Sequence, residues 1–270
     1  MYLCDMILMG VVNLTPDSFR PETRAMSIEA ARARVADLVA RGCSIIDFGA
    51  VSTRPGAADV PVEEEWRRLE PVLAEIPSPA AQVRNDSVLY PEVCVCHSEE
   101  AEGRRRNLPP ISVDTTSAEI VRRTYGLIGR FLVNDISAGE DDPAMLETVA
   151  ELGLPYVAMH KRGNPRSMDA LTDYPQGVVK AVDEYFEGFA AKAEALGIKD
   201  WILDPGFGFA KTAEQNWELL ENLPALRRFG RPILVGVADK RFTHTPNPFG
   251  SCQNAEQLAA ERGADILRIH

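Results

Sequence analysis

The stretch "WILDPGFGFAKT", residues 201–212, begins as an apolar run and stops at a carboxylate, Asp204. After Pro205, two glycines alternate with two aromatic residues, Phe207 and Phe209. A short, nearly continuous apolar run of this kind is typical of a strand that is covered on both faces, as in a parallel sheet. The acid and the two glycines at its end raise the question of what this strand holds there.

Seven more runs of the same kind lie along the chain, and most are rich in Val, Ile and Leu; they span residues 7–13, 44–50, 110–115, 131–137, 155–160, 232–237 and 266–270. Between them, apolar residues recur at helical spacing over residues 28–38, 66–76, 145–152, 178–189 and 217–220, and around Leu258. A strand followed by a helix, repeated to eight strands, predicts an α/β fold of the TIM (β/α)8 barrel type. A doubly wound sheet is the structural alternative, but no G-x-G-x-x-G motif follows the first run.

The domain organisation follows from length and from two irregular regions. The chain has 270 residues, 45% of them hydrophobic, which fits a single barrel domain over residues 1–270. Residues 77–109 are long and polar and include "GRRR" at 103–106, which predicts an insertion after the second helix. The chain ends at His270, in or directly after the eighth run, so we expect the barrel to lack its final helix.

The composition of the chain limits the classes of partner that it can bind and indicates its cellular compartment. A net charge of −11 disfavours nucleic-acid and anionic-membrane partners, both of which attract basic surfaces. The five cysteines are odd in number and irregularly spaced, which argues against a disulfide framework and favours a reducing, cytoplasmic location. The "CVCH" stretch at 94–97 has no second half of a zinc site after it. The N-terminal "MYLCDMILMGVV" has Asp5 inside its apolar stretch and no basic leader, so we expect a first strand there and not a signal peptide.

Polar residues stand at the carboxyl side of nearly every predicted strand: Asn13, Asp114, Asn134, His160, Asp204, Arg268 and His270. Active sites of barrels lie at that face. A single residue of this kind is most simply a strand-end cap, but the repetition over six strands weakens that explanation. The sequence therefore predicts a polar site at the carboxyl end of the barrel.

The residue types at these positions indicate a flat heterocyclic ligand. Asp114, Asn134 and Asp204 offer hydrogen-bond acceptors, and the amide adds donors. Buried acceptors need partners, and two neighbouring carboxylates repel each other unless ligand N–H groups lie between them. A guanidine-like edge, as in pterins and guanines, meets this need. Gly206 and Gly208 allow close backbone approach, and Phe207 or Phe209 can cover an aromatic ring.

Eight motifs in order along the chain resemble the dihydropteroate synthase family: "GVVNLTPDSF" (10–19), "STRPGA" (52–57), "ISVDTT" (111–116), "NDIS" (134–137), "MHKRGNP" (159–165), "DPGFGFAKT" (204–212), "LVGVADKRF" (234–242) and "ADILRIH" (264–270). The resemblance implies a TIM barrel transferase of an alkyl group in folate biosynthesis. Such an enzyme joins 6-hydroxymethyl-7,8-dihydropterin diphosphate to 4-aminobenzoate with Mg²⁺ and gives 7,8-dihydropteroate and diphosphate. It also implies a dissociative, SN1-like transfer.

The resemblance also assigns roles to individual residues. The pterin would be held by Asp114, Asn134, Asp204, Lys240, Met159 and Arg268. The diphosphate would be held by Asn13, Arg54, Arg268 and His270, with Asn13 as a Mg²⁺ contact. The 4-aminobenzoate pocket would be shaped by Phe19, Thr53, Arg54, Pro55, Phe207 and Lys240. The catalytic set would be Lys240, Arg268, His270 and Arg54.

Departures from the family pattern keep two further functions open. Ala50 and Val51 replace a family carboxylate, and Asp239 stands where the family has a basic residue beside Lys240. The change at Asp239, together with a first loop that reads "DSFRPETR" without the glycine turn of the family, motivates a pterin-binding homologue without transferase activity, which would act as a binding or partner protein. A methyltetrahydrofolate-dependent methyltransferase domain is the third reading, and "STRPG", Lys240 and the Arg268/His270 pair favour the synthase over it. The homodimer usual in the family is formed through the last helices, so the missing helix places it in question.

Overall fold

The computed structural model describes residues 6–14, 28–52, 57, 59–75, 111–164 and 166–270. The predicted insertion at residues 77–109 lies outside this set. So do Phe19, Thr53, Arg54 and Pro55, to which the sequence assigns substrate contacts, and the "CVCH" stretch.

The described residues form a barrel of eight parallel strands: β1 (Ile7–Asn13), β2 (Ile45–Gly49), β3 (Ile111–Asp114), β4 (Leu132–Asp135), β5 (Tyr156–Met159), β6 (Trp201–Asp204), β7 (Leu234–Val235) and β8 (Ile266–Ile269). Their order is β6-β5-β4-β3-β2-β1-β8-β7, and every pair is parallel. A parallel bridge between Leu203 and Ile233 joins β6 to β7, so the two edges of the sheet meet. The TIM barrel predicted from the sequence is confirmed.

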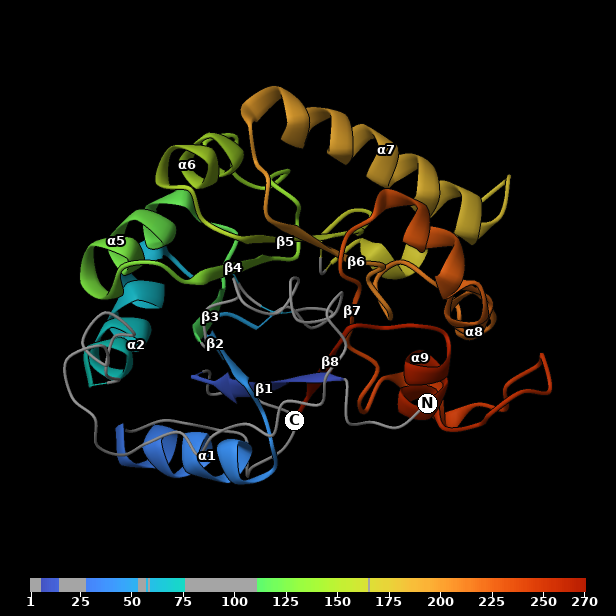
Figure 1. Cartoon of the computed structure of the whole chain (residues 1–270), viewed down its shortest axis with the longest axis horizontal. Coiled ribbons are helices and arrows are strands. Elements are labelled where there is room, and N and C mark those ends of the chain that lie inside the picture. Colours follow the sequence, from blue (N-terminus) through green and yellow to red (C-terminus); the bar gives the residue numbers. More distant parts are fainter. Residues whose placement is uncertain (1–5, 15–27, 53–56, 58, 76–110, 165) are drawn as a thin grey trace.

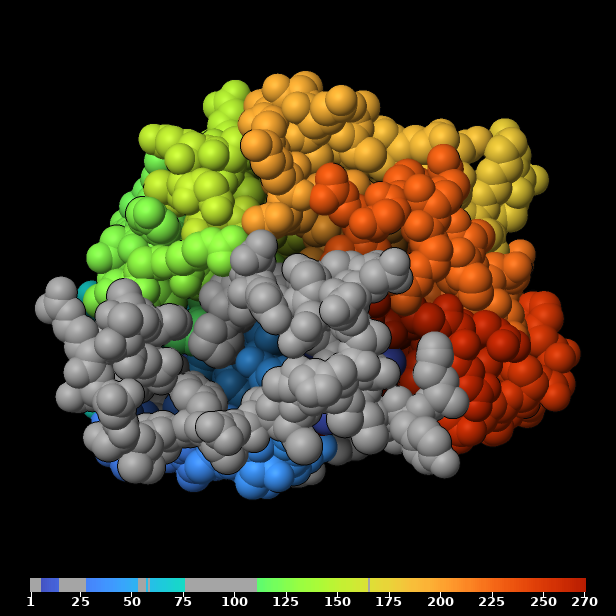
Figure 2. Space-filling model, in the orientation of Figure 1, coloured from blue at the N-terminus to red at the C-terminus, as the bar shows by residue number. Residues whose placement is uncertain are grey.

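Helices lie outside the ring of strands (Figure 1). They are α1 (Ile28–Ala40), α2 (Val62–Glu75), α5 (Ala118–Ile128), α6 (Met145–Leu152), α7 (Val178–Leu196), α8 (Ala213–Glu221) and α9 (Ala255–Glu261), with the 3-10 turns η3 (Met168–Ala170), η4 (Leu223–Phe229) and η5 (Arg241–His244). In the space-filling view of the same side, α6, α7 and α8 adjoin one another without a gap (Figure 2). α5 was not among the helices predicted from the sequence.

Two separate apolar clusters hold the barrel together, because side chains alternate between the two faces of each strand. The smaller cluster fills the inside of the barrel and consists of Met9, Ile45, Leu132, Val157, Ile202, Leu234 and Ile266. The larger one packs the outer face of the strands against the helices, with Phe48, Tyr156 and Trp217 among its largest fully buried members. The inside of the barrel is therefore a packed core near the amino ends of the strands.

The chain between β7 and α9 is mostly irregular. Asn247 anchors this part, since its side-chain amide donates to Ser251 Oγ at 2.9 Å and to the Cys252 carbonyl at 3.1 Å. Asn254 caps α9 by accepting from Gln257 N. In the described part of the chain β8 is the last element, and none of the described helices is long and apolar enough to cross a membrane.

Candidate active site

Beyond the smaller apolar cluster, which we call the plug, several of the next inward-facing positions are polar. Two residues beyond the plug on their strands stand Asp47, Asn134, Met159, Asp204, Gly236 and Arg268. Because the side-chain period of a strand is two, these residues face the same interior as the plug but nearer the carboxyl ends of the strands. Four of these residues, Asp47, Asn134, Asp204 and Arg268, are polar, so a polar cup follows directly on the apolar core.

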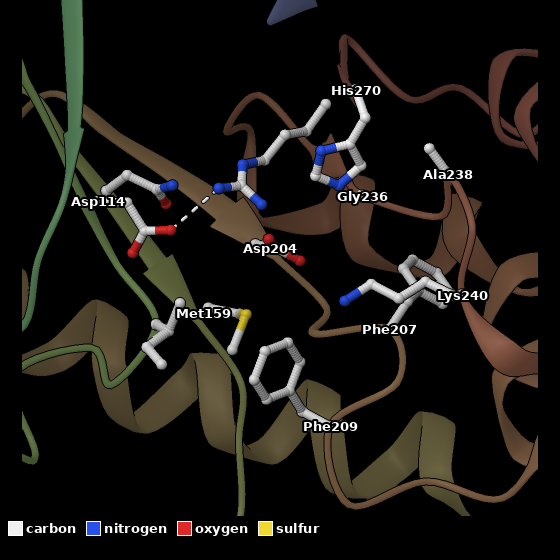
Figure 3. Close-up of a pocket in the computed structure, with 12 residues that line it drawn as sticks. Asp114, Met159, Asp204, Phe207, Phe209, Gly236, Ala238, Lys240 and His270 are labelled. Atoms are coloured by element: carbon white, nitrogen blue, oxygen red, sulfur yellow. Dashed lines mark hydrogen bonds and ion pairs between the residues drawn. The ribbon is translucent and has the colours of Figure 1, made fainter. Parts of the chain in front are cut away.

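A cavity that is partly open to solvent lies over this cup. It is lined by Asp114, Asn134, Ile136, Met159, Asp204, Phe207, Phe209, Gly236, Ala238, Lys240, Arg268 and His270. All six residues predicted to hold the pterin are among them. Figure 3 shows the acids and Met159 on one side of the cavity and Lys240 with the aromatic rings on the other.

Asp204 is fixed by the loop that follows it. Its Oδ1 accepts a hydrogen bond from Gly206 N at 2.8 Å. Gly206 has φ +71°, and a Cβ there would lie 1.9 Å from the carbonyl oxygen of His160, at the end of β5. Only glycine fits this turn, which lets β5 and β6 end side by side. Burial raises the pKa of Asp204, so its ionised form needs donors that the protein supplies only in part.

Asp114 and Arg268 form an ion pair across the opposite side of the cup. Nη2 of Arg268 lies 2.9 Å from Oδ2 of Asp114, drawn as the dashed line in Figure 3. Burial raises the pKa of Asp114 to about 7, although Arg268 acts in the opposite direction. Burial by itself would lower the pKa of Arg268, but Asp47 and Asp114 raise it overall, so Arg268 is a permanent cation.

Lys240 lies over an aromatic ring at the other side of the cavity. Its Nζ is 4.9 Å from the centroid of the Phe209 ring. Burial and the charge of Arg268 lower its pKa to about 8. Phe207 lines the cavity and is buried. Its ring stacks on Phe242, with 6.1 Å between the ring centroids, and Phe242 does not line the cavity itself. This side of the cavity therefore combines a cation with an aromatic surface.

Lys211 holds the loop that carries the two phenylalanines. Its buried Nζ donates to the carbonyl oxygens of Gly206 at 2.8 Å and Phe209 at 3.0 Å, and it lies 3.0 Å from Nδ1 of His160. Burial, then the charge of Lys211, lowers the pKa of His160 well below its ordinary value, which favours a neutral ring. His160 therefore lies against the loop after β6 and is not among the residues that line the cavity.

The structure describes two of the other predicted site residues, His270 and Asn13. His270 lines the cavity directly after β8. Asn13 is the last residue of β1 and is not among the residues that line this cavity. Its Oδ1 and Oδ2 of Asp114 would each lie 3.8 Å from a Cβ placed on Gly49, so the two side chains flank the same glycine. Phe19, Thr53, Arg54 and Pro55 lie outside the described residues, and their roles stay predictions.

Sequence reasoning missed two kinds of residue. Ile136, Gly236 and Ala238 line the cavity without any polar signal. Asp47 was missed because it stands in the middle of its apolar run, "SIIDFGA", and not at the end. An acid within a run that otherwise predicts a buried strand is a usable signal, since such an acid needs partners.

Comparison with known proteins agrees with the fold. The family model described as "Pterin binding enzyme" matches residues 9–88 and 99–270. The dihydropteroate synthase of Synechocystis is 36% identical, over 97% of this chain and 84% of its own. The dihydropteroate synthase of Xanthomonas albilineans solved with 4-aminobenzoic acid has a TM-score of 0.74 and 34% identity, over 99% of this chain and 88% of its own. Its complex with indole-2-carboxylic acid and 6-chloroguanine has a TM-score of 0.75 and 33% identity, over 100% and 89%.

The fold and these similarities together define a barrel enzyme, with a cup at the carboxyl ends of its strands. The chain belongs to the pterin-binding enzyme family, and its similarity to dihydropteroate synthases extends over nearly its whole length.

Proposed function

We propose that the protein is a dihydropteroate synthase. It condenses 6-hydroxymethyl-7,8-dihydropterin diphosphate with 4-aminobenzoate and gives 7,8-dihydropteroate and diphosphate. The observation that carries this proposal is the convergence of Asp114, Asn134 and Asp204, from three strands, on one cavity. The similarity to dihydropteroate synthases, one solved with 4-aminobenzoic acid and one with a guanine derivative, supports it.

The electrostatics of the cup favour a ligand with several N–H groups. Burial raises the pKa of both Asp114 and Asp204, because the pocket replaces water incompletely. The 2-amino-4-oxo pyrimidine ring of a pterin brings N–H donors that restore the lost hydrogen bonds. It also carries the positive charge that develops when the leaving group departs, and the two carboxylates stabilise that charge.

The reaction breaks the C–O bond between the pterin methylene and diphosphate, and both electrons leave with the diphosphate. The methylene carbon is left as a cation that the pterin ring delocalises. The lone pair of the aniline nitrogen then forms the C–N bond, and that nitrogen releases one proton to solvent. Arg268 and His270 lie where β8 ends and stabilise the departing charge, together with Arg54 of the predicted loop. An aromatic amine is already a neutral nucleophile, so no strong base is required.

On the other side of the cavity, Lys240 and the Phe207/Phe209 pair would receive 4-aminobenzoate. The ammonium group of Lys240 matches the carboxylate of this substrate, and the rings match its aromatic face. Phe19, Thr53 and Pro55 would complete this pocket. The proposal places the two substrates on opposite sides of one cavity, with the methylene carbon between them.

We also propose that Mg²⁺ assists the reaction. Among the described residues no group of three or more His, Cys, Asp or Glu side chains could hold the ion alone. Mg²⁺ usually binds through one or two protein oxygens together with substrate phosphates and water, so a donor set with Asn13 as its protein ligand fits. When bound, the ion would neutralise charge on the diphosphate. Chelation by EDTA should abolish diphosphate release and leave binding of the unphosphorylated pterin alcohol unchanged; turnover that survives EDTA would remove Mg²⁺ from the account.

A turnover assay tests the function directly. Purified protein is mixed with Mg²⁺ and both substrates, and released diphosphate and dihydropteroate are measured. We expect both products in equal amounts. Without 4-aminobenzoate we expect no dihydropteroate, and only the diphosphate that slow hydrolysis releases. Pterin binding without turnover would support the non-catalytic homologue instead, which the acid Asp239 directly before Lys240 motivates. Methyl transfer from methyltetrahydrofolate would support the third reading.

We infer that the physiological partners are these small molecules and not nucleic acid, given the net charge of −11. The two cysteines in the part of the chain that the structure describes, Cys43 and Cys252, are both free thiols, which supports a reducing, cytoplasmic location. Whether two copies associate is a matter for sedimentation or light scattering.

A further inference from the structure

One buried acid is not used by the mechanism above. Asp47 stands in the middle of β2, between Ile45 of the apolar plug and Gly49. Its side chain is fully buried, and it does not line the cavity. A carboxylate at such a position destabilises the fold unless its oxygens are satisfied, so its partners indicate what it is for.

Each oxygen of Asp47 has defined partners. Oδ1 accepts from Ser112 Oγ at 2.7 Å. Oδ2 accepts from Asn134 Nδ2 at 3.1 Å and from Arg268 Nε at 2.8 Å, and Nη2 of Arg268 lies 2.7 Å away. Oδ2 therefore contacts two residues that line the cavity, from β4 on one side and β8 on the other.

We propose that Asp47 is a positioning residue, which fixes the side-chain amide of Asn134 and the guanidinium of Arg268 for the substrate. The inference rests on the proposed function, because it concerns how the same cup is held in its binding geometry.

The effect on Asn134 is a choice between two amide orientations. An ionised carboxylate can only accept hydrogen bonds, so the nitrogen of the amide must face Asp47. The carbonyl oxygen Oδ1 is then left for the ligand. Together with Asp114 and Asp204 it makes three acceptors around the cup, which suits a donor edge and rejects a ring that presents an acceptor there.

The effect on Arg268 concerns what happens when the ligand arrives. In the structure its guanidinium contacts both Asp47 and Asp114. A pterin that binds Asp114 takes over one of these anchors, and Asp47 remains as the other. The arginine then keeps a fixed pivot while its remaining N–H groups face the diphosphate.

The test compares Asp47→Asn with wild type and with Ser112→Ala, a matched control that removes a partner of the same carboxylate but does not line the cavity. Calorimetry measures binding of 6-hydroxymethyl-7,8-dihydropterin diphosphate, and urea unfolding measures stability. We expect Asp47→Asn to weaken binding about 10- to 100-fold, as for loss of a charged hydrogen-bond partner, and Ser112→Ala to change it less than about threefold.

A pH series supplies a readout that a merely structural role would not change. Asp114 is faced by Arg268 of β8, Asp47 of β2, Glu65 of α2 and Asp135 of β4. Loss of the negative charge at position 47 should let Asp114 ionise at lower pH, so the acid limb of pterin binding should move to lower pH in Asp47→Asn and stay in place in Ser112→Ala.

The outcomes are distinct. If wild type does not bind the pterin diphosphate, the proposed function fails. If wild type binds and Asp47→Asn binds equally well with an unmoved acid limb, only the role of Asp47 is overturned. Should Asp47→Asn not fold, Asp47→Glu takes its place; it keeps the charge, displaces the carboxylate by one methylene and is expected to weaken binding while remaining folded. Failure of both variants to fold would also overturn the proposal, because Asp47 would then serve the barrel itself.

Discussion

Asp204 shows how one side chain can belong both to a strand and to a ligand site. Its carboxylate is buried at the end of β6, and the backbone N–H of Gly206 supplies one hydrogen bond at 2.8 Å. The remaining acceptor capacity faces the cavity. The acid that ends the run in "WILDPG" is therefore best explained by a ligand that completes its hydrogen bonds.

Replacing Asp204 by Asn should weaken binding of the pterin diphosphate by about 1–3 kcal/mol, because one acceptor becomes a donor that faces the ligand's own N–H groups. Calorimetry on the purified variant measures this. Asp200→Asn is the matched control, since Asp200 lies just before the same strand and is 54% exposed in an ion pair with Arg130. Equal affinities for the two variants would remove Asp204 from the site.

Titration of Lys240 should make the affinity for anionic substrates fall at high pH. Burial and Arg268 lower its pKa to about 8, and Asp204 and Asp114 partly oppose this effect. The ammonium form exists below that pKa, so affinity for 4-aminobenzoate should fall as the pH rises through about 8. In Lys240→Met the affinity should be low throughout, and this fall should be absent. A fall that persists unchanged in Lys240→Met would assign the titration to another group.

Among the elements of the fold, the carboxyl ends of β5 and β6 must lie close together to form the site. Gly206 allows this because a Cβ at that position would overlap the backbone of His160. Gly197, at the carboxyl end of α7, has nearly the same backbone conformation with φ +73°, but nothing lies within 4 Å of a Cβ placed there. Substitution of Gly197 tests the left-handed backbone alone, and substitution of Gly206 tests the same backbone together with a steric overlap.

Gly197→Ala should lower the free energy of unfolding by only about 1–2 kcal/mol, the cost of a left-handed conformation for alanine. Gly206→Ala should lower it further and should also abolish pterin binding, because the strand end must move. Urea unfolding and calorimetry on both variants measure the difference. If the two substitutions cost the same and both proteins bind the pterin, the close approach of the strands is not needed for the site.

All eight strands could be predicted from the sequence because each is a continuous apolar run. The polar residues at their ends could be predicted to lie together because parallel strands all end at the same face of the barrel. The sequence did not predict α5. The buried side of that helix includes Thr124 beside Ile120 and Val121, so its apolar stripe is interrupted even though Ser117 caps its start. It also did not reveal Asp47, whose partners come from β3, β4 and β8 and exist only once the barrel has closed.

At the scale of the whole molecule, the cup exists only in the closed barrel, because its three acceptors come from β3, β4 and β6. A ligand that binds only the folded state raises its stability by about 2.7 kcal/mol at a concentration 100 times its Kd. For a chain of this size that corresponds to a rise in Tm of roughly 5–10 °C.

Thermal unfolding with and without the pterin diphosphate should therefore show a rise of this size in wild type and a smaller one in Asp204→Asn at the same ligand concentration. A Tm that the ligand leaves unchanged in wild type would mean that the folded barrel has no pterin site.

The most direct measurement is a crystal structure of the protein soaked or co-crystallised with the pterin alcohol, 6-hydroxymethylpterin. We expect the ring inside the barrel mouth, with its pyrimidine N–H groups within hydrogen-bond distance of Asp114, Asn134 and Asp204. A ring bound elsewhere, or one whose donor edge faces away from these three side chains, would contradict this expectation.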